Sequence, residues 1–347
     1  MPPQLFQHAL LNWFDQHGRK DLPWQQPISP YRVWVSEVML QQTQVSTVIP
    51  YFQRFMLTFP TIEQLANAPL DVVLQHWAGL GYYARGRNLH QAAQQIVKQG
   101  FFPNSLADLT ALPGIGLSTA GAILSIAFQT ATPILDGNVR RVLARFCAIE
   151  GWTGESKISQ QLWEISRFYT PHHRVADYTQ AIMDLGATLC TRSKPICRLC
   201  PLMTNCLAYQ QNKTALLPTP KKSKQLPVKT IVLLGLKQQQ GFYLEKRPPI
   251  GIWGGLWSLP EFATLDAART WCLEQNIQII EEKIFTKQRH TFSHYHLDYT
   301  PLLIYSNNPI NRVMEGEQNV WYNSEEIFTL ALPAPIAKLM QVFISKE

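Results

Sequence analysis

LTALPGIGLSTAGAILSIA, residues 109–127, decides the fold of the first part of the chain. A helical apolar pattern ends at Pro113, and a second helical pattern starts near Ser118. Gly114 and Gly116 lie between them. Two glycines beside a helix N-terminus let the backbone approach a phosphate, which the exposed amides and the helix dipole attract. An ordinary turn between two helices gives the same pattern, so the stretch alone is a weak signal for phosphate binding.

Helical periodicity continues on both sides of this hairpin, from about Gln4 to about Gln210. Apolar residues recur at i, i+3 and i+4, with Pro and Gly between the segments. This pattern predicts an all-helical domain over residues 1–212. The clearest helical segments are residues 31–59, 70–77, 88–99 and 118–128.

A change of pattern marks a second domain. Residues 216–227, LLPTPKKSKQLP, combine three prolines with lysines and lack an apolar face, so we predict a linker over residues 213–229. Short β-branched and aromatic runs follow, such as TIVLLGL, GFYLEKR and HTFSHYHLDYTPLLIY, with one helical stretch near residues 265–275. We predict an α+β domain over residues 230–347.

The composition excludes several classes of protein. The 347-residue chain is 46% apolar and 16% charged, which is untypical of disordered proteins, and its length suggests two domains. The longest apolar runs are far shorter than the roughly 20 residues that span a bilayer. The N-terminus, MPPQLFQHALLNWF, does not resemble a secretory signal. We expect a cytoplasmic protein that acts as a monomer and has no membrane partner.

The net charge of +7 is unevenly distributed. Residues 1–212 carry 16 basic and 12 acidic side chains, and residues 213–229 carry five lysines and no acid. Residues 230–347 carry 10 basic and 12 acidic side chains. A polyanion is therefore expected on the first two thirds and the connector. A charge that only aids solubility is the alternative.

Four of the six cysteines are spaced C-x6-C-x2-C-x5-C. Because no secretory signal is expected, this cluster indicates a metal centre more than disulfides, and zinc and an iron-sulfur cluster both remain open. Arg192 and Lys194 lie between the first two cysteines, in a short loop that would present them to phosphates. The cysteines are Cys190, Cys197, Cys200 and Cys206.

Two acids lie in unusual surroundings. Glu37, in VWVSEVMLQQTQV, has apolar neighbours on both sides. Burial there would raise its pKa and keep it protonated, as a general acid requires. Asp136, in ILDGNVRRVLAR, lies between an apolar run and a basic helix. The alternative interpretations are that Glu37 lies on a polar helix face and that Asp136 caps a helix.

These motifs together resemble the helix-hairpin-helix DNA glycosylase superfamily, and within it the adenine DNA glycosylases of the MutY type. The segments that carry the resemblance are LPGIGLSTA, ILDGNV, SEVMLQQTQV, GLGYYARGRNL and the cysteine loop. The resemblance implies a mainly α fold, with a two-lobed helix-hairpin-helix glycosylase domain. It also implies that the cysteine loop, residues 190–206, holds a [4Fe-4S] cluster.

The same resemblance implies a substrate and roles for several residues. The substrate would be duplex DNA with adenine opposite 8-oxoguanine or guanine, and the base would have to leave the duplex before its glycosidic bond is broken. Glu37 would protonate N7 of adenine, Asp136 would stabilise the cationic sugar, and Asn138 would orient this chemistry. Gln42 and Tyr82 would contact the opened duplex, with Gly114 and Gly116 on the phosphates.

Ser118 separates two related activities. In the endonuclease III enzymes a lysine at this place forms a Schiff base and leads to strand cleavage, and here no lysine lies between Gly100 and Pro133. We expect a glycosylase without efficient lyase activity, with Ser118 in a supporting role. A noncatalytic protein that binds DNA lesions and a bifunctional pyrimidine glycosylase are the alternatives.

The C-terminal domain resembles a Nudix domain, here with a recognition role. With the hydrolase box laid on Gly255, two of its acidic positions hold Thr270 and Leu273. Because hard cations need several carboxylates, we expect this domain to recognise a nucleotide without hydrolysing it. The resemblance assigns recognition of 8-oxoguanine to Phe292, Ser293 and His294.

Overall fold

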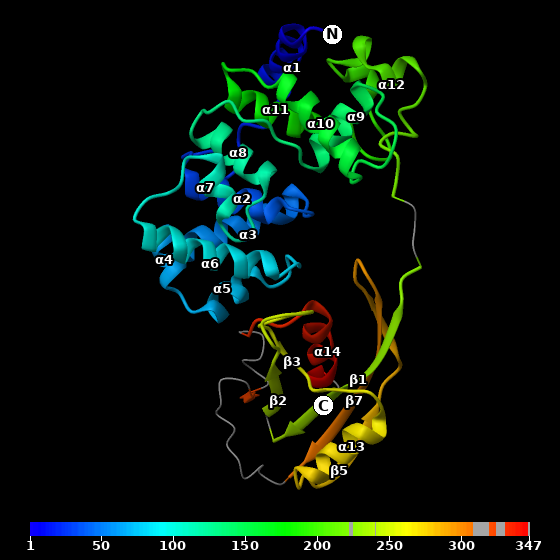
Figure 1. Ribbon diagram of the computed structural model, residues 1–347. Coiled ribbons are helices and arrows are strands. Elements are labelled where there is room, and N and C mark those ends of the chain that lie inside the picture. The colour runs from blue at the N-terminus through cyan, green and yellow to red at the C-terminus, as the bar shows by residue number, and fades with distance from the viewer. Residues whose placement is uncertain (222–224, 240, 308–318, 324–329, 346–347) are drawn as a thin grey trace. The chain divides into compact units, whose positions relative to one another are not determined.

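The computed structural model (Figure 1) describes residues 1–221, 225–239, 241–307, 319–323 and 330–345. Contacts along the chain define two compact units. The first unit is Met1–Asn67 with Asn88–Ser223, and the second is Ala68–Arg87 with Lys224–Glu347. None of the helices in the described ranges is long and apolar enough to cross a membrane.

The first unit is helical, as its sequence pattern predicts, and among its described residues no β-strand is assigned. Its helices are α1 (Pro3–His17), α2 (Pro30–Leu40), α3 (Val45–Thr58), α4 (Ile62–Asn67), α6 (Ala84–Gln99, which begins in the second unit), α7 (Leu106–Ala111), α8 (Leu117–Ala127), α9 (Gly137–Phe146), α10 (Ser156–Tyr169), α11 (Val175–Thr188) and α12 (Leu207–Gln210), with 3-10 turns η1 (Cys197–Leu199) and η2 (Met203–Asn205).

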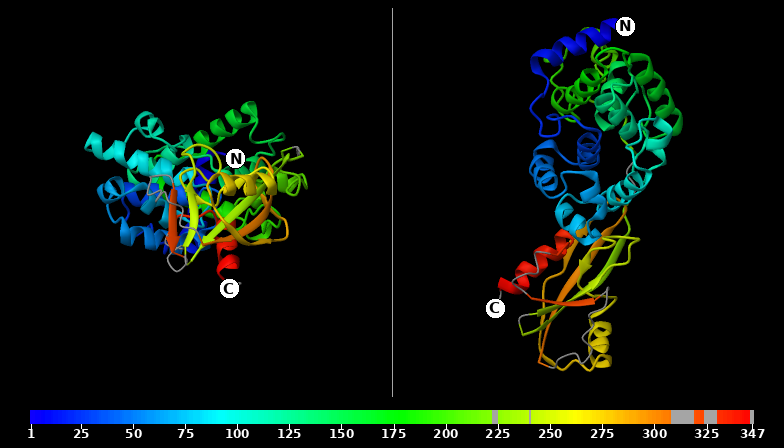
Figure 2. Two further views of the ribbon diagram at one scale, coloured as in Figure 1. Left: turned by 90° about the horizontal axis from the view of Figure 1, so that it is seen from below. Right: turned by 90° about the vertical axis from the view of Figure 1, so that its left-hand side faces the viewer.

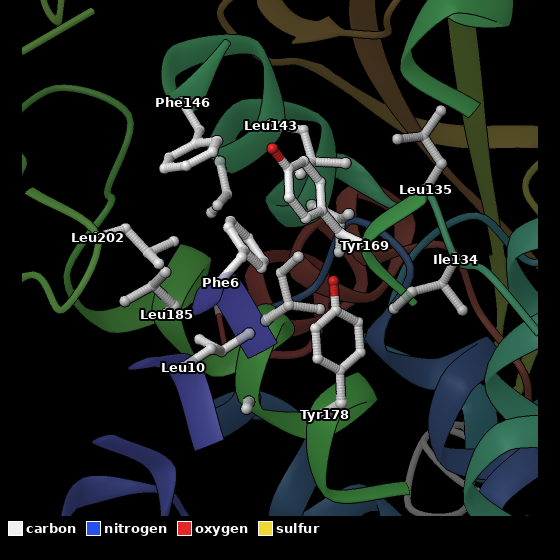
Figure 3. Packing of buried hydrophobic residues seen from close by; sticks show 14 of the residues in the cluster. Phe6, Leu10, Ile134, Leu135, Leu143, Phe146, Tyr169, Tyr178, Leu185 and Leu202 are labelled. Atoms are coloured by element: carbon white, nitrogen blue, oxygen red, sulfur yellow. The ribbon is translucent and has the colours of Figure 1, made fainter. Parts of the chain in front are cut away.

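Two lobes form within this unit. Helices α1 and α9 each pack with α10 and α11, whereas α2 packs with α3 and α8. The first lobe has an aromatic core (Figure 3), in which the ring of Phe6 lies 4.3 Å from Tyr169 and 4.9 Å from Phe146 between centroids. Phe6, Leu10 and Phe14 recur at i, i+4 and i+8, so one face of α1 is buried.

An extended segment, residues 132–136, lies against α8 and leads into α9. Ser125 Oγ donates to the carbonyl of Thr132 at 2.8 Å, and Ser118 Oγ accepts from the N–H of Leu135 at 3.0 Å. Between these serines, an added Cβ on Gly121 would lie 2.4 Å from the carbonyl oxygen of Pro133. One face of α8 therefore holds this segment at very short range.

The second unit contains a mixed sheet with helices on both faces. Its described strands are ordered β3-β2-β1-β7-β5, and β4, β6 and β8 pair with β1, β7 and β2. The strands are β1 (Val228–Gln238), β2 (Gly241–Lys246), β3 (Trp257–Ser258), β4 (Glu261–Phe262), β5 (Ile279–Ile284), β6 (Gln288–Thr291), β7 (His296–Ser306) and β8 (Asn319–Asn323), and its helices are α5 (Leu70–Trp77), α13 (Leu265–Glu274) and α14 (Ala334–Ser345).

Helices α13 and α14 cover opposite faces of the sheet (Figure 2), and the alternation of side chains along β1 explains this arrangement. Leu234 and Leu236 share a core with Ala268 and Cys272 of α13. Gly235 points the other way, where an added Cβ would lie 2.4 Å from the ring of Phe343 on α14. The predicted helix near residues 265–275 is confirmed as α13, whereas α14 was not predicted.

The predicted linker, residues 213–229, is partly held by the first unit. Leu217 is buried and its carbonyl accepts from Arg145 Nε at 2.8 Å. Thr219 Oγ1 accepts from the N–H of Gly151 at 3.1 Å. The second unit's strand β1 begins at Val228, so the described part of the linker that precedes residue 222 is docked and not free.

We predict that Gly121→Ala destabilises the fold by about 1 to 3 kcal/mol, because its methyl group would displace residues 132–136. Gly137→Ala is the matched control, since an added Cβ at Gly137 meets nothing within 4 Å. The control should keep the wild-type stability or gain slightly. Urea unfolding of the three proteins measures both effects, and equal stabilities would show that the close approach is unimportant.

Candidate active site and cysteine loop

Helix α2 places Glu37 in apolar surroundings. Ser29 caps the helix by accepting from the N–H of Arg32, and Pro30 occupies the first turn. Val35, Val38 and Met39, which flank Glu37, are buried. Burial and, second, the negative charge of Asp136 raise the pKa of Glu37 from 4.5 to about 8. Glu37 therefore keeps its proton at neutral pH, as predicted from its neighbours.

Asp136 is the N-cap of α9, so the alternative reading of this residue as a helix cap is confirmed. Its Oδ1 accepts from the N–H of Val139 at 2.8 Å. Burial raises the pKa of Asp136, whereas hydrogen bonds from Val139 and Asn138 and the charge of Arg141 oppose that shift. Because Asp136 has donors that favour its charged form, its environment differs from that of Glu37.

Side chains of three helices fix the backbone that leads into Asp136. Besides the bond from Leu135 to Ser118, Ser166 Oγ of α10 donates to the carbonyl of Ile134 at 2.7 Å. Arg140 Nε of α9 donates to the carbonyl of Leu135 at 3.2 Å. Sequence reasoning missed Ser166, although a serine between Leu162 and Tyr169 on a buried helix face is a usable signal.

The hairpin between α7 and α8 has the geometry that its glycines predict. Gly114 has a φ of +78°, and an added Cβ would lie 2.8 Å from the Cβ of Asn88. Gly116 is the N-cap of α8 and provides no side-chain cap, and an added Cβ there meets nothing within 4 Å. The start of α8 is therefore uncapped by its own N-cap side chain and open beside Gly116, as an anion site at a helix N-terminus requires.

Asn138 lies where α9 crosses α11. An added Cβ on Gly186 would lie 2.6 Å from the Cβ of Asn138, so only glycine allows this approach. Arg141 Nη2 donates to Asn138 Oδ1 at 2.8 Å and to the carbonyl of Gly186 at 2.7 Å. Its Nε donates to the carbonyl of Cys190 at 2.6 Å. Arg141 thus connects the start of α9 to the cysteine loop.

The four clustered cysteines line one cavity, together with Leu202, Tyr209 and their neighbours. Burial raises the pKa of Cys200 to about 12, so this thiol stays protonated unless a metal replaces the proton. Across the described ranges, which include these cysteines, no group of three or more His, Cys, Asp or Glu is arranged to hold a metal ion. The four thiols that line one cavity are the donor set of a thiolate metal centre, and they are compatible with an iron-sulfur loop.

Arg145 holds the cysteine loop from inside. Its guanidinium, 2% exposed, donates to Cys190 Sγ at 3.3 Å and to the carbonyls of Thr191 and Arg192 at 2.7 and 3.0 Å. The side chains of Arg192 and Lys194 are exposed. The loop therefore has a fixed backbone and outward cations, which suits phosphate contacts.

Gln42 and Tyr82 share a feature that the sequence does not reveal. Both are exposed and have a positive φ, 57° and 49° respectively. Non-glycine residues rarely adopt this conformation, and such strain is concentrated at functional sites. Gln42 follows α2 and Tyr82 precedes α6, so each lies in a turn where a side chain can project outward.

Phe292, Ser293 and His294 form the tip between β6 and β7, a turn that we call the reading loop (residues 291–295). Phe292 donates its N–H to the carbonyl of Tyr295 at 2.9 Å. Its ring lies 5.5 Å from Trp253 and 4.5 Å from His290 between centroids. Trp253 was not predicted, because it joins the loop only through tertiary packing, and His290, on β6 next to the loop, was missed as well.

Comparisons with known proteins agree with this geometry. The model of the HhH-GPD superfamily base excision DNA repair proteins matches residues 35–168, and the NUDIX domain model matches residues 231–342. The adenine DNA glycosylase of Buchnera aphidicola subsp. Acyrthosiphon pisum (strain APS) is 40% identical over 345 residues, 99% of each chain. The chain belongs to the adenine DNA glycosylase family.

This adenine DNA glycosylase family member is also similar to more distant proteins. The human adenine DNA glycosylase is 34% identical over 418 residues, which cover 99% of this chain and 74% of that protein. The structure of a thermostable thymine-DNA glycosylase has a TM-score of 0.53 at 24% identity and covers 60% of this chain and 97% of its own. An endonuclease III–DNA complex gives a TM-score of 0.51 at 20% identity, over 61% and 98%. These two similarities show the fold alone.

Two charged residues of the Nudix box in this glycosylase family member, Glu261 and Arg269, are held in ion pairs. Glu261 forms an ion pair with Arg247. Arg269 is bound by Glu282 at 2.6 Å and by Asp266 at 2.9 Å. Leu273 replaces a box carboxylate and is 69% exposed. Glu261 and Arg269 of the box therefore pair with neighbouring charged residues.

We predict that Glu37→Gln stabilises the protein increasingly between pH 5 and 9. The pKa of Glu37 is about 8 in the folded chain against 4.5 as a free group, so the folded state binds more protons and wild-type stability falls as pH rises through this window. Glutamine avoids this loss. Thermal unfolding measures the difference, with the exposed Glu164→Gln as the control. Parallel wild-type and Glu37→Gln curves would contradict the assignment.

Proposed function

We propose that this chain is an adenine DNA glycosylase of base excision repair, which hydrolyses the N-glycosidic bond of adenine mispaired with 8-oxoguanine or guanine in duplex DNA. The observation that carries this proposal is the pair of acids, Glu37 and Asp136. They are close enough for the charge of one to shift the pKa of the other, yet only Asp136 has donors that favour ionisation. Such a pair supplies an acid and an anion to one substrate.

Binding places the target base outside the duplex. The free amides at the start of α8, beside Gly116, bind a backbone phosphate, and Arg192 and Lys194 add cations. Tyr82 enters the space that the base leaves, and Gln42 contacts the bases that remain. Rotating a base out costs a few kcal/mol of stacking and pairing, so these contacts must offset that cost before chemistry begins.

The chemistry assigns one role to each acid. Glu37, protonated at neutral pH, donates to N7 of adenine, so that the base leaves as a neutral molecule. The C1′ carbon then develops positive charge, which the carboxylate of Asp136 stabilises until water attacks C1′ and passes its proton to the Glu37 carboxylate. Asn138 bonds to Asp136 and Arg141 and orients the carboxylate. The reaction ends with free adenine and an abasic site.

Ser118 supports a glycosylase without efficient lyase activity. Its hydroxyl accepts a hydrogen bond from Leu135 at 3.0 Å, which makes it a positioning residue for the neighbouring Asp136. No lysine lies nearby in the hairpin sequence. Without an amine to form a Schiff base with the sugar, strand cleavage by this route has no nucleophile.

The cysteine loop is proposed to hold a [4Fe-4S] cluster through Cys190, Cys197, Cys200 and Cys206. When bound, the cluster cross-links the four cysteines and so rigidifies the loop. Arg145 and Arg141 supply the hydrogen bonds that hold the loop backbone against α9. Arg192 and Lys194 then project from a fixed backbone toward DNA.

The reading loop of the second unit is proposed to recognise the base opposite adenine. Phe292 offers an aromatic face, and Ser293 and His294 are exposed and offer hydrogen-bonding groups. Discrimination between 8-oxoguanine and guanine requires contacts to the few atoms by which they differ, and one good contact set changes the binding free energy by about 1 to 3 kcal/mol.

We predict that Asp136→Asn and Glu37→Gln each slow adenine release by at least about 100-fold, because the first removes the charge and the second the proton. Asparagine caps helices as well as aspartate, so Asp136→Asn should fold and bind duplex DNA like the wild type. Single-turnover base release from an A:8-oxoguanine duplex measures the loss. If the wild-type protein itself binds the duplex but never releases adenine, the result would instead support the alternative, a noncatalytic lesion-binding protein.

A further inference from the structure

A strained turn presents Tyr82, and we call this turn the wedge loop (residues 79–83). Gly79, Gly81 and Tyr82 have φ values of 98°, 72° and 49°. Arg85 holds the turn, since its Nη2 donates to the carbonyls of Leu80 and Gly81 at 3.1 and 3.2 Å and its guanidinium lies 5.5 Å from the ring of Tyr82. The position of the exposed Tyr82 is therefore set by its anchors.

A second strained loop, the bridging loop (residues 247–256), touches the reading loop. Trp253 has a φ of 56°, is 8% exposed and packs against Phe292 and His290. An added Cβ on Gly254 would lie 2.5 Å from the carbonyl oxygen of Pro249. Arg247 Nε donates to the carbonyl of Ile252 at 2.9 Å. These contacts make the bridging loop rigid, so movement at Phe292 displaces Gly254 with Trp253.

Arg87 joins the two loops within the second unit. Its backbone N–H donates to the carbonyl of Tyr83 at 3.1 Å, and its Nη1 donates to the carbonyl of Gly254. Tyr83 Oη donates to the carbonyl of Leu332 at 3.3 Å. Burial lowers the pKa of Arg87, so its guanidinium is partly removed from water, where a hydrogen bond to a carbonyl is strengthened. One residue therefore bonds to both the wedge loop and the bridging loop.

We propose that Arg87 is a positioning residue for specificity, which couples the fit of the opposite base at the reading loop to the placement of Tyr82 in the duplex. This inference rests on the functions proposed above for Phe292 and Tyr82. A base that packs on Phe292 fixes Trp253 and Gly254, and Arg87 carries that constraint to Tyr83 and Tyr82. A base that fits poorly leaves the wedge loop without this support, so adenine opposite it is released more slowly.

The test replaces Arg87 by lysine in the full-length protein, which keeps the positive charge and removes the guanidinium fork. Single-turnover adenine release is measured on A:8-oxoguanine and A:guanine duplexes at one salt concentration. The preference for 8-oxoguanine should shrink by about 2- to 30-fold, with the A:guanine rate nearly unchanged. Combining Arg87→Lys with Ser293→Ala and His294→Ala should cause little further loss, because the variants interrupt one route.

Asp71→Asn is the matched control. Asp71 pairs with Lys246 at 2.7 Å and so also ties residues 68–87 to the sheet, but without touching the bridging loop. It should leave the preference unchanged. Hydrogen exchange of the DNA-free protein provides a readout independent of catalysis, in which Arg87→Lys should accelerate exchange in both the wedge loop and the reading loop.

Several results would overturn the inference. Rates that fall equally on both duplexes would mean that Arg87 serves only folding. If Asp71→Asn reduced the preference for 8-oxoguanine as much as Arg87→Lys, any contact that holds residues 68–87 against the sheet would be sufficient. If Ser293→Ala and His294→Ala abolish the preference while Arg87→Lys does not, the coupling is wrong and the proposed reading loop stands. If Arg87→Lys abolishes the preference while Ser293→Ala and His294→Ala leave it unchanged, the reading-loop assignment fails instead.

Discussion

The placement of Asp136 depends on how the extended residues 132–136 are held. This segment pairs with no described strand, so its backbone groups need side-chain partners. Ser125, Ser166 and Ser118 satisfy the carbonyls of Thr132 and Ile134 and the N–H of Leu135 in turn. Gly121 allows α8 to approach closely enough for the bonds of Ser118 and Ser125. Asp136 follows at a fixed point and caps α9 as a result.

The start of α9 gives the two acids different surroundings. Both carboxyls lose water, and burial raises the pKa of each. Hydrogen bonds from Val139 and Asn138 and the charge of Arg141 oppose that shift for Asp136, because they stabilise a negative charge at the start of α9. Glu37 lies on α2 among apolar side chains, and both causes that shift its pKa raise it. The helix terminus thus gives the two carboxyls different environments, as the proposed roles of an acid and an anion require.

Much of this arrangement could be predicted from local sequence. Apolar spacing predicted the helices, and residues 70–77 coincide with α5. The apolar neighbours of Glu37 predicted its raised pKa. The glycines of the hairpin predicted the exposed start of α8. These features depend on residues adjacent in sequence, so periodicity and turn chemistry are sufficient to find them.

Other features could not be found this way, because they arise from contacts between distant segments. Trp253 joins Phe292, and Arg87 reaches Gly254, only after the second unit folds. The positive φ of Gln42 has no sequence signal, so residues 31–59 were predicted as one helical segment and are in fact α2 and α3. The buried Leu217 was likewise hidden in a stretch whose prolines and lysines indicated an exposed linker.

The central claim is that Glu37 delivers the proton to adenine with a pKa of about 8. The most direct test is the single-turnover rate of adenine release on one duplex as a function of pH, measured above the point where Asp136 has ionised. The account predicts a plateau near neutral pH and, above about pH 8, a fall of about tenfold per pH unit. A rate that stays constant to pH 10, or rises, would contradict it, because the proton would then come from another group.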